Sequence, residues 1–285
     1  MKKENCITVG SNVMVGKFPC KVEINKIYNM DCLEGMAKLP DGCIDLTVTS
    51  PPYDNLRTYN GFSWDFEGVA KELYRVTKDG GVVVWIVGDR VKNGSETLIP
   101  FKQALYFKEI GFNVHDTMIY QKNVMPFPEQ TRYIQCFEYM FIFSKGKPIT
   151  HNLLKEKTKG YKPSKTSTQR NVDGTTTQLK YEQGKEYRNR WNVWIYDVGF
   201  NKTTKDKFAF DHPAMFPEQL AQDHIISWSN EGDLVLDPFM GSGTTAKMAK
   251  LNNRNYIGFE ISKDYCDIAN KRISNHHEQL KIVGD

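Results

Sequence analysis

Residues 233–246, which read Asp-Leu-Val-Leu-Asp-Pro-Phe-Met-Gly-Ser-Gly-Thr-Thr-Ala, decide the fold class of this chain. An apolar run with the length of a buried strand leads into two glycines and then into residues that can open a helix. Glycine lets the backbone approach a ligand closely, and the first turn of a helix offers free N–H groups and the positive end of the helix dipole. The stretch therefore predicts a strand, a glycine turn and a helix that hold a cofactor. Glu260 ends the next apolar run, where its carboxylate could accept from two ribose hydroxyls.

Short apolar runs alternate with amphipathic stretches outward from this motif, which favours a mostly parallel sheet covered by helices on both faces. We therefore expect a doubly wound α/β domain. Leu98, Phe101 and Leu105 mark the expected buried stripe of one helix. The expected strands cover residues 26–29, 44–49, 81–87, 112–121, 139–144, 233–237 and 255–260, and the expected helices cover residues 66–77, 97–110, 217–229, 243–251 and 263–276.

The composition is that of a globular chain without a membrane span. Of its 285 residues 40% are apolar and 25% charged, which excludes a disordered, collagen-like or disulfide-stapled polypeptide. No stretch reaches the roughly 18 uninterrupted apolar residues that a membrane span needs, so we expect a cytoplasmic protein that associates with the nucleoid if it binds DNA. The six cysteines form no CxxC pair and the six histidines lack ligand spacing, so we expect no metal site.

Residues 144–207 carry the excess positive charge. They contain fifteen lysines or arginines and six aspartates or glutamates, a local net charge of +9, whereas the whole chain has a net charge of +4. They are also rich in Thr, Gln, Asn and Gly, which predicts an inserted, loop-rich region. Such a region suits a nucleic acid, although a solvated loop with surface lysines has the same composition. We interpret Trp191, Trp194 and Tyr196 as a small hydrophobic anchor for the insertion.

A second motif, residues 45–53, reads Asp-Leu-Thr-Val-Thr-Ser-Pro-Pro-Tyr. Its two prolines supply no N–H, so the chain cannot continue the sheet, and the carbonyls of Ser50 and Pro51 are left without local donors. Tyr53 offers a flat face on which a base can stack. Acceptors beside a stacking ring suit an aromatic NH₂, because accepting its hydrogen bonds favours a tetrahedral nitrogen whose lone pair can attack an electrophile. The motif therefore predicts chemistry on an amino group without a covalent intermediate.

Each motif alone has other interpretations. The glycine stretch also fits the dinucleotide pattern G-x-G-x-x-A, with Glu260 19 positions after Gly241, so a nicotinamide enzyme is an alternative. Both motifs are also compatible with turns that bind nothing, because glycine turns and Pro-Pro pairs are common in loops. A nicotinamide enzyme has no use for residues 50–53, so the two motifs together favour chemistry on an amine.

Together the two motifs resemble those of the β class of amino-group DNA methyltransferases, in which the catalytic motif comes first, a variable region follows and the cofactor motif comes last. Residues 29–34, 212–218 and 258–260 also resemble motifs of that family. The resemblance implies a Rossmann-like, circularly permuted fold and S-adenosylmethionine as cofactor. It divides the chain into a catalytic half at 1–124, a target-recognition insertion at 125–207 that holds the last sheet strand near 139–144, and a cofactor-binding half at 208–285. The implied catalytic residues are Ser50, Pro51, Pro52 and Tyr53, and the implied cofactor-binding residues are Asp31, Phe216, Asp237, Phe239, Gly241, Ser242, Gly243 and Glu260.

Double-stranded DNA is the substrate that the resemblance implies, and the target nucleotide has to be rotated out of the stack. Serine at position 50, where adenine-modifying relatives usually have aspartate, makes N4 of cytosine the expected target and N6 of adenine the alternative. C5-cytosine chemistry is disfavoured because it needs a thiolate and the second motif contains none. The candidates for DNA contacts are Arg57, Lys162, Lys165, Arg170, Arg188 and Arg190, and Lys122 and Asn123 are further candidates for substrate contacts.

Other substrates and partners stay open at this point. RNA or a protein amide also presents a planar amine, and a nucleic-acid-binding module with an empty cofactor pocket is an alternative of a different class. The intact Ser50, Tyr53 and glycine turn argue against such a module. Relatives of the β class are often dimers, so a second copy of the chain and a cognate restriction endonuclease are further candidate partners.

Overall fold

A computed structural model describes residues 8–9, 12–13, 22–52, 64–123, 131–158, 166–180, 186–212 and 215–282. The chain separates into two compact units. The large unit contains residues 1–152 and 192–285, and the small unit contains residues 153–191. In the described part of the chain, no helix is both long and apolar enough to cross a membrane.

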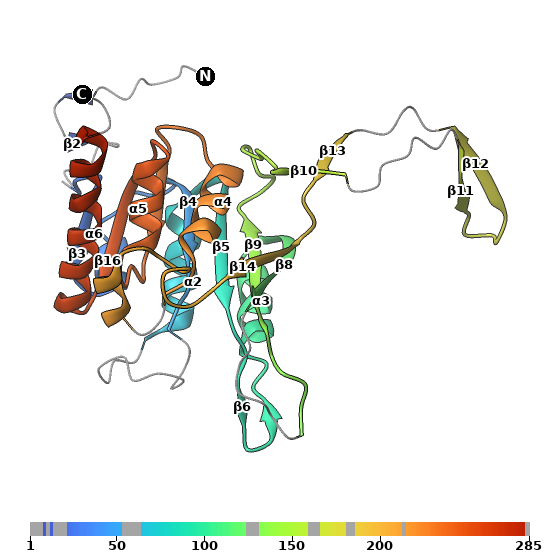
Figure 1. Cartoon of the computed structure of the whole chain (residues 1–285), viewed down its shortest axis with the longest axis horizontal. Coiled ribbons are helices and arrows are strands. Elements are labelled where there is room, and N and C mark those ends of the chain that lie inside the picture. The colour runs from blue at the N-terminus through green and yellow to red at the C-terminus, as the bar shows by residue number, and fades with distance from the viewer. Residues whose placement is uncertain are drawn as a thin grey trace. The chain divides into compact units, whose positions relative to one another are not determined.

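The large unit is built on one eight-stranded sheet with the strand order β14-β8-β9-β5-β4-β15-β16-β3 (Figure 1). Neighbouring strands are parallel except at β9, which runs antiparallel to both β5 and β8. The predicted mostly parallel sheet is therefore confirmed. The strands are β3 (Lys26–Asn29), β4 (Ile44–Thr49), β5 (Thr77–Val87), β8 (Asn113–Asn123), β9 (Phe137–Ser144), β14 (Val193–Asp197), β15 (Leu234–Asp237) and β16 (Asn255–Glu260).

The strands β4 and β15 lie side by side, although Thr49 at the end of β4 and Leu234 at the start of β15 are far apart in the sequence. They are parallel, so the loops that follow them leave the same edge of the sheet. Each motif continues from its strand into the loop, which begins at Ser50 after β4 and at Pro238 after β15. In open α/β sheets this carboxyl edge is where ligands bind.

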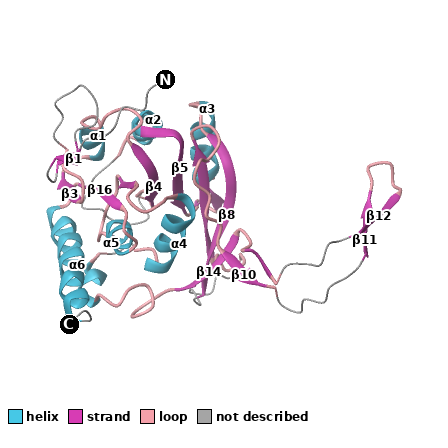
Figure 2. Ribbon diagram, turned by 90° about the horizontal axis from the view of Figure 1, so that it is seen from above, coloured by secondary structure: helices cyan, strands magenta, loops and turns pink. Residues whose placement is uncertain are grey.

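Helices cover both faces of the sheet, as expected (Figure 2). Three of them pack on one face and contact each other in chain order, and three pack on the other face in the same way. The first group is α1 (Cys32–Met36), α2 (Phe66–Val76) and α3 (Ile99–Glu109), and the second is α4 (Glu218–Trp228), α5 (Thr244–Leu251) and α6 (Lys263–Ile282).

The core on the α1–α3 face is aromatic. Trp85 of β5 and Phe107 of α3 are fully buried, with ring centroids 5.0 Å apart. Phe107 also stacks on Phe143 of β9 at 4.4 Å. Burying such rings contributes roughly 2–3 kcal/mol each relative to exposure, so this layer fixes α3 against the sheet.

The expected buried stripe of α3 is wrong. Leu98, Phe101 and Leu105 are 47%, 40% and 68% exposed. The buried face is formed instead by residues that include Gln103 and Phe107. Gln103 takes an inward position because its Oε1 accepts a hydrogen bond of 2.9 Å from the indole Nε1 of Trp85. A polar residue that satisfies a buried indole thus sets the rotation of the helix, which the apolar pattern could not indicate.

The expected strands do not include the edge strand β14. Trp194 and Tyr196 of this strand are buried, whereas Val193 and Ile195 on its other side are 43% and 58% exposed. β14 pairs in parallel with β8. Two of the three aromatic residues that we interpret as an anchor of the insertion therefore belong to the central sheet.

The remaining elements are short. The small unit contains two antiparallel strand pairs, β10 with β13 and β11 with β12. In the large unit, β1 pairs with β2 and β6 pairs with β7. Their bounds are β1 (Thr8–Val9), β2 (Asn12–Val13), β6 (Val91–Lys92), β7 (Ser95–Glu96), β10 (Lys155–Lys157), β11 (Thr166–Arg170), β12 (Thr176–Lys180), β13 (Tyr187–Asn189) and the 3₁₀ helix η1 (Lys207–Asp211).

Candidate active site

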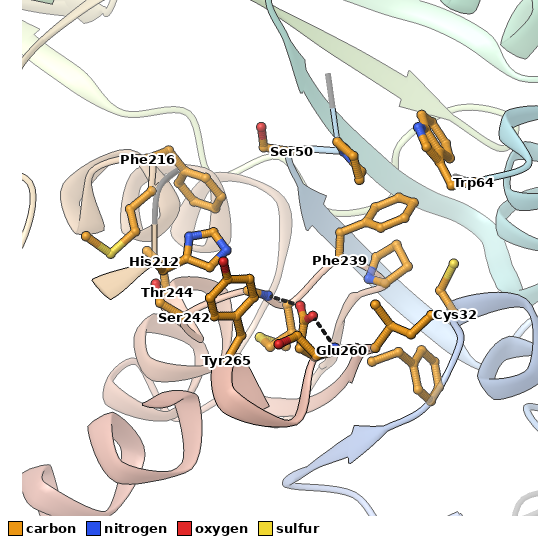
Figure 3. Close-up of a pocket in the computed structure, with 18 of the residues that line it drawn as sticks. Cys32, Ser50, Trp64, His212, Phe216, Phe239, Ser242, Thr244, Glu260 and Tyr265 are labelled. Carbon is orange, nitrogen blue, oxygen red and sulfur yellow. Dashed lines mark hydrogen bonds between the residues drawn. The ribbon is translucent and has the colours of Figure 1, made fainter. Parts of the chain in front are cut away.

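The carboxyl edge of the sheet holds a cavity that both sequence motifs line (Figure 3). Ser50 and Pro52, which follow β4, face into it together with Gly241 and Ser242, which follow β15. Residues of the loops after β3 and β16 also line it. The two motifs therefore open onto one space and not onto opposite sides of the molecule.

The structure brings eight of the predicted site residues together in this cavity. Pro51 is buried, and neither Pro51 nor Asp237 nor Gly243 is among the lining residues. Tyr53 lies outside the described residues. The eight residues in the lining are Asp31, Ser50, Pro52, Phe216, Phe239, Gly241, Ser242 and Glu260.

The glycine turn needs its glycines for two different reasons. Gly241 has φ 51°, and a Cβ placed there would lie 2.8 Å from Nε2 of His212, a ring that also lines the cavity. Gly243 has φ 83°, and a Cβ there would lie 2.7 Å from Cβ of Ala269 on α6. A left-handed backbone conformation with no room for a side chain requires glycine. Gly241 thus lets a cavity residue approach, and Gly243 lets α5 begin against α6.

Glu260 joins the glycine turn to the end of β16. Its Oε2 accepts from the backbone N–H of Gly241 at 2.7 Å, and its Oε1 accepts from the backbone N–H of Ser262 at 2.8 Å. Burial raises the pKa of this carboxyl, and the backbone N–H groups partly offset that effect. Both oxygens keep further acceptor capacity, because each carboxylate oxygen can accept two hydrogen bonds.

Asp237 is buried at the end of β15 and connects the two motif-bearing strands. Its Oδ1 accepts from Oγ1 of Thr49 at 2.6 Å and from the backbone N–H of Phe239 at 3.0 Å. Burial raises the pKa of Asp237 to about 6, against the opposing effect of these hydrogen bonds. Thr49 directly precedes Ser50, so Asp237 fixes the start of one loop relative to the start of the other.

Asp31 occupies the N-cap position of α1. Its Oδ1 accepts from the backbone N–H groups of Leu33 at 2.8 Å and of Glu34 at 3.3 Å. An N-cap aspartate satisfies free N–H groups of the first turn and stabilises a helix by about 1 kcal/mol. This cap holds the Asp31 carboxylate at the cavity wall.

An aromatic group forms another part of the cavity wall. Phe239 contacts Trp64 edge to face at 5.1 Å, and Trp64 lies 6.1 Å from Trp85 of the core. Trp64 and Phe239 both line the cavity. The sequence motifs do not indicate Trp64, because it stands at the end of a stretch without a recognisable pattern just before α2.

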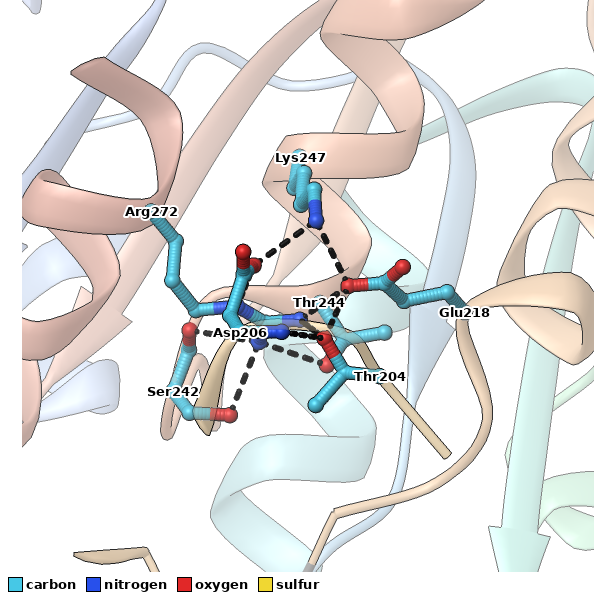
Figure 4. Close-up of polar contacts among 7 residues, drawn as sticks. All are labelled: Thr204, Asp206, Glu218, Ser242, Thr244, Lys247 and Arg272. Atoms are coloured by element: carbon cyan, nitrogen blue, oxygen red, sulfur yellow. Dashed lines mark hydrogen bonds and ion pairs between the residues drawn. The ribbon is translucent and has the colours of Figure 1, made fainter. Parts of the chain in front are cut away.

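Four charged residues, of which Lys247 and Arg272 are buried and Asp206 and Glu218 partly buried, hold the segment before α4 (Figure 4). We call these four residues the charge cluster. Arg272 of α6 donates to Asp206 at 3.0 Å and to Glu218 at 2.5 Å. Lys247 of α5 contacts the same two carboxylates at 2.7 and 2.8 Å. Burial opposes ionisation of both carboxyls. Hydrogen bonds from Lys247 and Arg272 outweigh it and hold the pKa of Asp206 below the ordinary value. For Glu218, hydrogen bonds from Lys247 and Thr204 together with the charges of Lys247 and Arg272 lower the pKa in the same way.

The charge cluster also reaches the cavity. Nη1 of Arg272 donates to the backbone oxygen of Ser242 at 2.8 Å and to its Oγ at 3.0 Å. His212 and Phe216, which lie between Asp206 and Glu218 in the chain, line the cavity. Lys247 of α5 and Arg272 of α6 therefore hold the chain at Asp206 and Glu218, and Arg272 also holds the glycine turn at Ser242.

A further part of the wall comes from β8 and β9, which β5 and β4 separate from β15 in the sheet. Nζ of Lys122 lies 2.5 Å from Oε1 of Glu138, and both residues line the cavity with Tyr120. The Lys122 side chain is 32% exposed and that of Glu138 13%. Burial raises the pKa of the Tyr120 hydroxyl, so this group stays protonated. No motif predicts Glu138, since its only sequence signal is one acidic residue at the start of an apolar strand.

The predicted DNA-contacting residues are only partly described. Arg57, Lys162 and Lys165 lie outside the described residues. Arg170 is exposed on β11, whereas Nη2 of Arg188 on β13 pairs with Oε1 of Glu156 at 2.7 Å. The guanidinium of Arg188 also lies 4.7 Å from the ring of Trp191. Arg190 follows β13 and is half-buried.

Within the described parts of the chain, no group of three or more His, Cys, Asp or Glu side chains is placed to hold a metal ion. The cysteine in the cavity wall keeps its thiol protonated. Cys32 lines the cavity, and burial raises the pKa of its thiol to about 12.

Solved structures of DNA methyltransferases share this fold. The chain aligns with PvuII DNA methyltransferase (cytosine-N4-specific) with a TM-score of 0.64 and 20% identity, over 86% of this chain and 85% of that one. It also aligns with a putative DNA modification methylase from Thermus thermophilus in complex with S-adenosyl-L-methionine, with a TM-score of 0.60 and 24% identity, over 88% and 93% of the two chains. The predicted Rossmann-like methyltransferase fold is confirmed.

Sequence comparison shows the family. Residues 44–271 match the profile of the N6 and N4 DNA methylases. The chain is 63% identical over 251 residues to the orphan methyltransferase M.BamHII of Bacillus amyloliquefaciens, covering 86% of this chain and 95% of the relative. It is 29% identical to the type II methyltransferase M.BglII of Bacillus subtilis, covering 94% and 74%.

The chain therefore belongs to the N6-adenine and N4-cytosine amino-group DNA methyltransferases, and it is an enzyme that uses S-adenosylmethionine. The resemblance stated from the two motifs is confirmed, and the nicotinamide alternative is wrong. Membership of this family also argues against C5-cytosine chemistry, although the sequence contains a Pro19-Cys20 pair outside the described residues.

Proposed function

We propose that the chain transfers the methyl group of S-adenosylmethionine to N4 of a cytosine that is rotated out of duplex DNA within a short recognition sequence. The observation that supports this most directly is the single cavity lined by Ser50 and Pro52 from one motif and by Gly241 and Glu260 from the other. A methyl group can pass between two bound molecules only if they share one space.

The residues of the cofactor side fit S-adenosylmethionine. Glu260 and Asp31 place two carboxylates at the cavity wall, where they can accept hydrogen bonds from the ribose and the adenine. Phe239 adds a ring, and the backbone at Gly241 carries no side chain. When bound, this cofactor supplies an electrophilic methyl carbon on a positively charged sulfonium. Phe216 and Ser242 complete the set that we assign to it.

On the substrate side we assign the amine to Ser50 and Pro51. The Ser50 hydroxyl and the Pro51 carbonyl accept hydrogen bonds from the NH₂ group and turn its lone pair toward the methyl carbon. Pro52 fixes the loop because its φ is restricted. Tyr53 stacks on the base. The reaction is a direct displacement at the methyl carbon, in which the N–C bond forms as the C–S bond breaks and S-adenosylhomocysteine leaves. The methylated nitrogen then gives up one proton to solvent, and no covalent intermediate on the enzyme is needed.

The choice of cytosine depends on Ser50. A hydroxyl is a neutral acceptor, whereas an aspartate at this position brings a charge, and the family contains both N4-cytosine and N6-adenine enzymes. N6 of adenine is therefore the second candidate. Incubating the protein with duplex DNA and methyl-labelled cofactor, followed by nucleoside mass spectrometry, separates N4-methylcytosine from N6-methyladenine. If neither nucleoside carries the label, the proposed function is overturned.

We assign target recognition to residues 125–207, which include the basic small unit. Lysines and arginines there can neutralise phosphates. Of the predicted DNA-contacting residues, Arg170, Arg188 and Arg190 lie in the part of the chain that the structure describes. A homodimer and a cognate restriction endonuclease are predictions of the family resemblance alone. Methylation mapping of DNA from a host that expresses the chain gives the recognition sequence and the modified base together.

A further inference from the structure

The wall formed by β8 and β9 contains a charged pair, Lys122 and Glu138, that has no role in the proposed methyl transfer. Lys122 is the one lysine or arginine among the described residues that line the cavity. Glu138 holds its ammonium at 2.5 Å. They project from β8 and β9, and the strands β5 and β4 lie between these two strands and β15, which leads into the glycine turn. Ser50, which follows β4, and Tyr120 line the same cavity.

The sheet register explains why these side chains face the cavity together. Tyr120 of β8 lies opposite Glu138 of β9, and Lys122 is two residues further along β8. Residues two apart in a strand point to the same face, so Tyr120, Lys122 and Glu138 share one face. The preceding pair on this face is Met118 opposite Met140. The face thus changes from buried methionines to a charged pair where it reaches the cavity.

Packing alone does not account for a charged pair at this place. Removing a lysine and a glutamate from water costs free energy that their attraction only partly returns, so such pairs are weak sources of stability. Glu138 is 13% exposed, and two apolar side chains would continue the methionine surface without that cost. A cation braced at a cavity wall is instead well suited to donate hydrogen bonds to a ligand.

The chemistry of the two candidate bases decides what such a cation can recognise. Next to its N4 amine, cytosine presents two acceptors, N3 and the carbonyl O2. Adenine presents one acceptor next to its N6 amine, N1, followed by a C–H group. The Lys122 ammonium has three N–H donors, of which one is directed to Glu138. Two remaining donors match the two acceptors of cytosine.

We propose that Lys122, held by Glu138, donates hydrogen bonds to the N3 and O2 edge of the flipped cytosine while Ser50 and Pro51 accept from its amine. This inference rests on the proposed function and adds the group that selects the base. A base that places a C–H group against the ammonium leaves one of its N–H donors without the acceptor that cytosine supplies, and sites built on hydrogen bonds discriminate against such a base.

The test separates base recognition from catalysis. It uses the duplex that methylation mapping identifies, with pyrimidin-2-one in place of the target cytosine, because this base keeps N3 and O2 but lacks the amine. The control duplex carries an abasic site at the same position. Fluorescence anisotropy in the presence of S-adenosylhomocysteine gives the preference of the protein for pyrimidin-2-one over the abasic site.

We expect the Lys122→Met variant to lose about 10-fold or more of this preference, the range for a hydrogen bond from a charged group. Glu138→Gln keeps an acceptor and should lose less. Lys78→Met is the matched control, because Lys78 forms an equally short pair with Asp45 at the opposite edge of the sheet. It should leave the preference unchanged, and all three variants should keep their cofactor affinity.

An unchanged preference in Lys122→Met, with cytosine still methylated by the wild-type protein, overturns this inference and leaves the proposed function standing. N6-methyladenine as the wild-type product overturns the choice of cytosine and the inference with it. If the wild-type protein binds the pyrimidin-2-one duplex no better than the abasic duplex, that result also contradicts the role of Lys122.

Discussion

Arg272 should be among the most sensitive single positions for stability, although it lies far in sequence from both motifs. Its side chain is 0% exposed, and it donates to the carboxylates of Asp206 and Glu218 as well as to Ser242. With Lys247 it balances the two carboxylates, whose side chains are only about a fifth exposed, so replacing Arg272 with methionine leaves one mostly buried negative charge uncompensated. Removing one partner of a buried ion pair typically costs about 3–5 kcal/mol. We expect Arg272→Met to lower the free energy of unfolding by that amount.

The assay is urea unfolding followed by tryptophan fluorescence and circular dichroism, with the cofactor affinity measured on the folded variant. Affinity should fall too, because Arg272 holds the Ser242 backbone at the cavity. Lys263→Met is the matched control on the same helix. Lys263 pairs with Asp267, but its side chain is 71% exposed and the pair is screened by solvent, so its loss should have little effect on stability. An equally small effect for Arg272→Met would refute the reasoning about the charge cluster.

Two further predictions concern Asp237 and Gly243, which lie on either side of Gly241 in the sequence. The pKa of Asp237 is raised to about 6, so the folded protein holds this proton at a pH where the unfolded chain has lost it, and stability falls as the pH rises from about 4 to about 6. The fall amounts to roughly 3 kcal/mol, and Asp237→Asn should remove it; parallel pH series of urea unfolding that do not diverge would contradict the burial effect. Gly243→Ala should destabilise by about 2–4 kcal/mol, since it combines a positive φ with a Cβ 2.7 Å from Ala269, whereas Gly232→Ala has φ 85° and open space and should cost about 1 kcal/mol. Equal melting temperatures for the two alanine variants would show that the contact with α6 is unimportant.

Much of the fold could be predicted because local patterns determine it. β3, β4 and β16 have the predicted bounds, since each is a short apolar run that ends at a polar or turn-forming residue. α1 has only five residues, too few for a helical period to show, and β14 depends on its pairing with β8, a strand distant in the sequence. Such pairing is a property of the tertiary structure and leaves little trace in the strand itself.

The site shows the same division. Ser50, Gly241 and Glu260 were predictable because proline, glycine and strand-end signals stand beside them in the sequence. Lys247 and Arg272 look like ordinary helix-surface residues, and only the fold brings carboxylates to them from 41 and 66 positions away. Trp64 reaches the cavity through packing on Phe239, which no local pattern could indicate.

The division of one cavity between cofactor and amine is tested most directly by measuring cofactor affinity and turnover side by side in Ser50→Ala and Glu260→Ala. Equilibrium dialysis gives the affinity, and methyl transfer to the mapped duplex gives the turnover. We predict that Ser50→Ala keeps its cofactor affinity within about 3-fold while turnover falls about 100-fold or more, and that Glu260→Ala weakens cofactor binding about 10-fold or more. If Ser50→Ala loses cofactor binding as severely as turnover, or if it methylates at the wild-type rate, the proposed division of the cavity between cofactor and amine is contradicted.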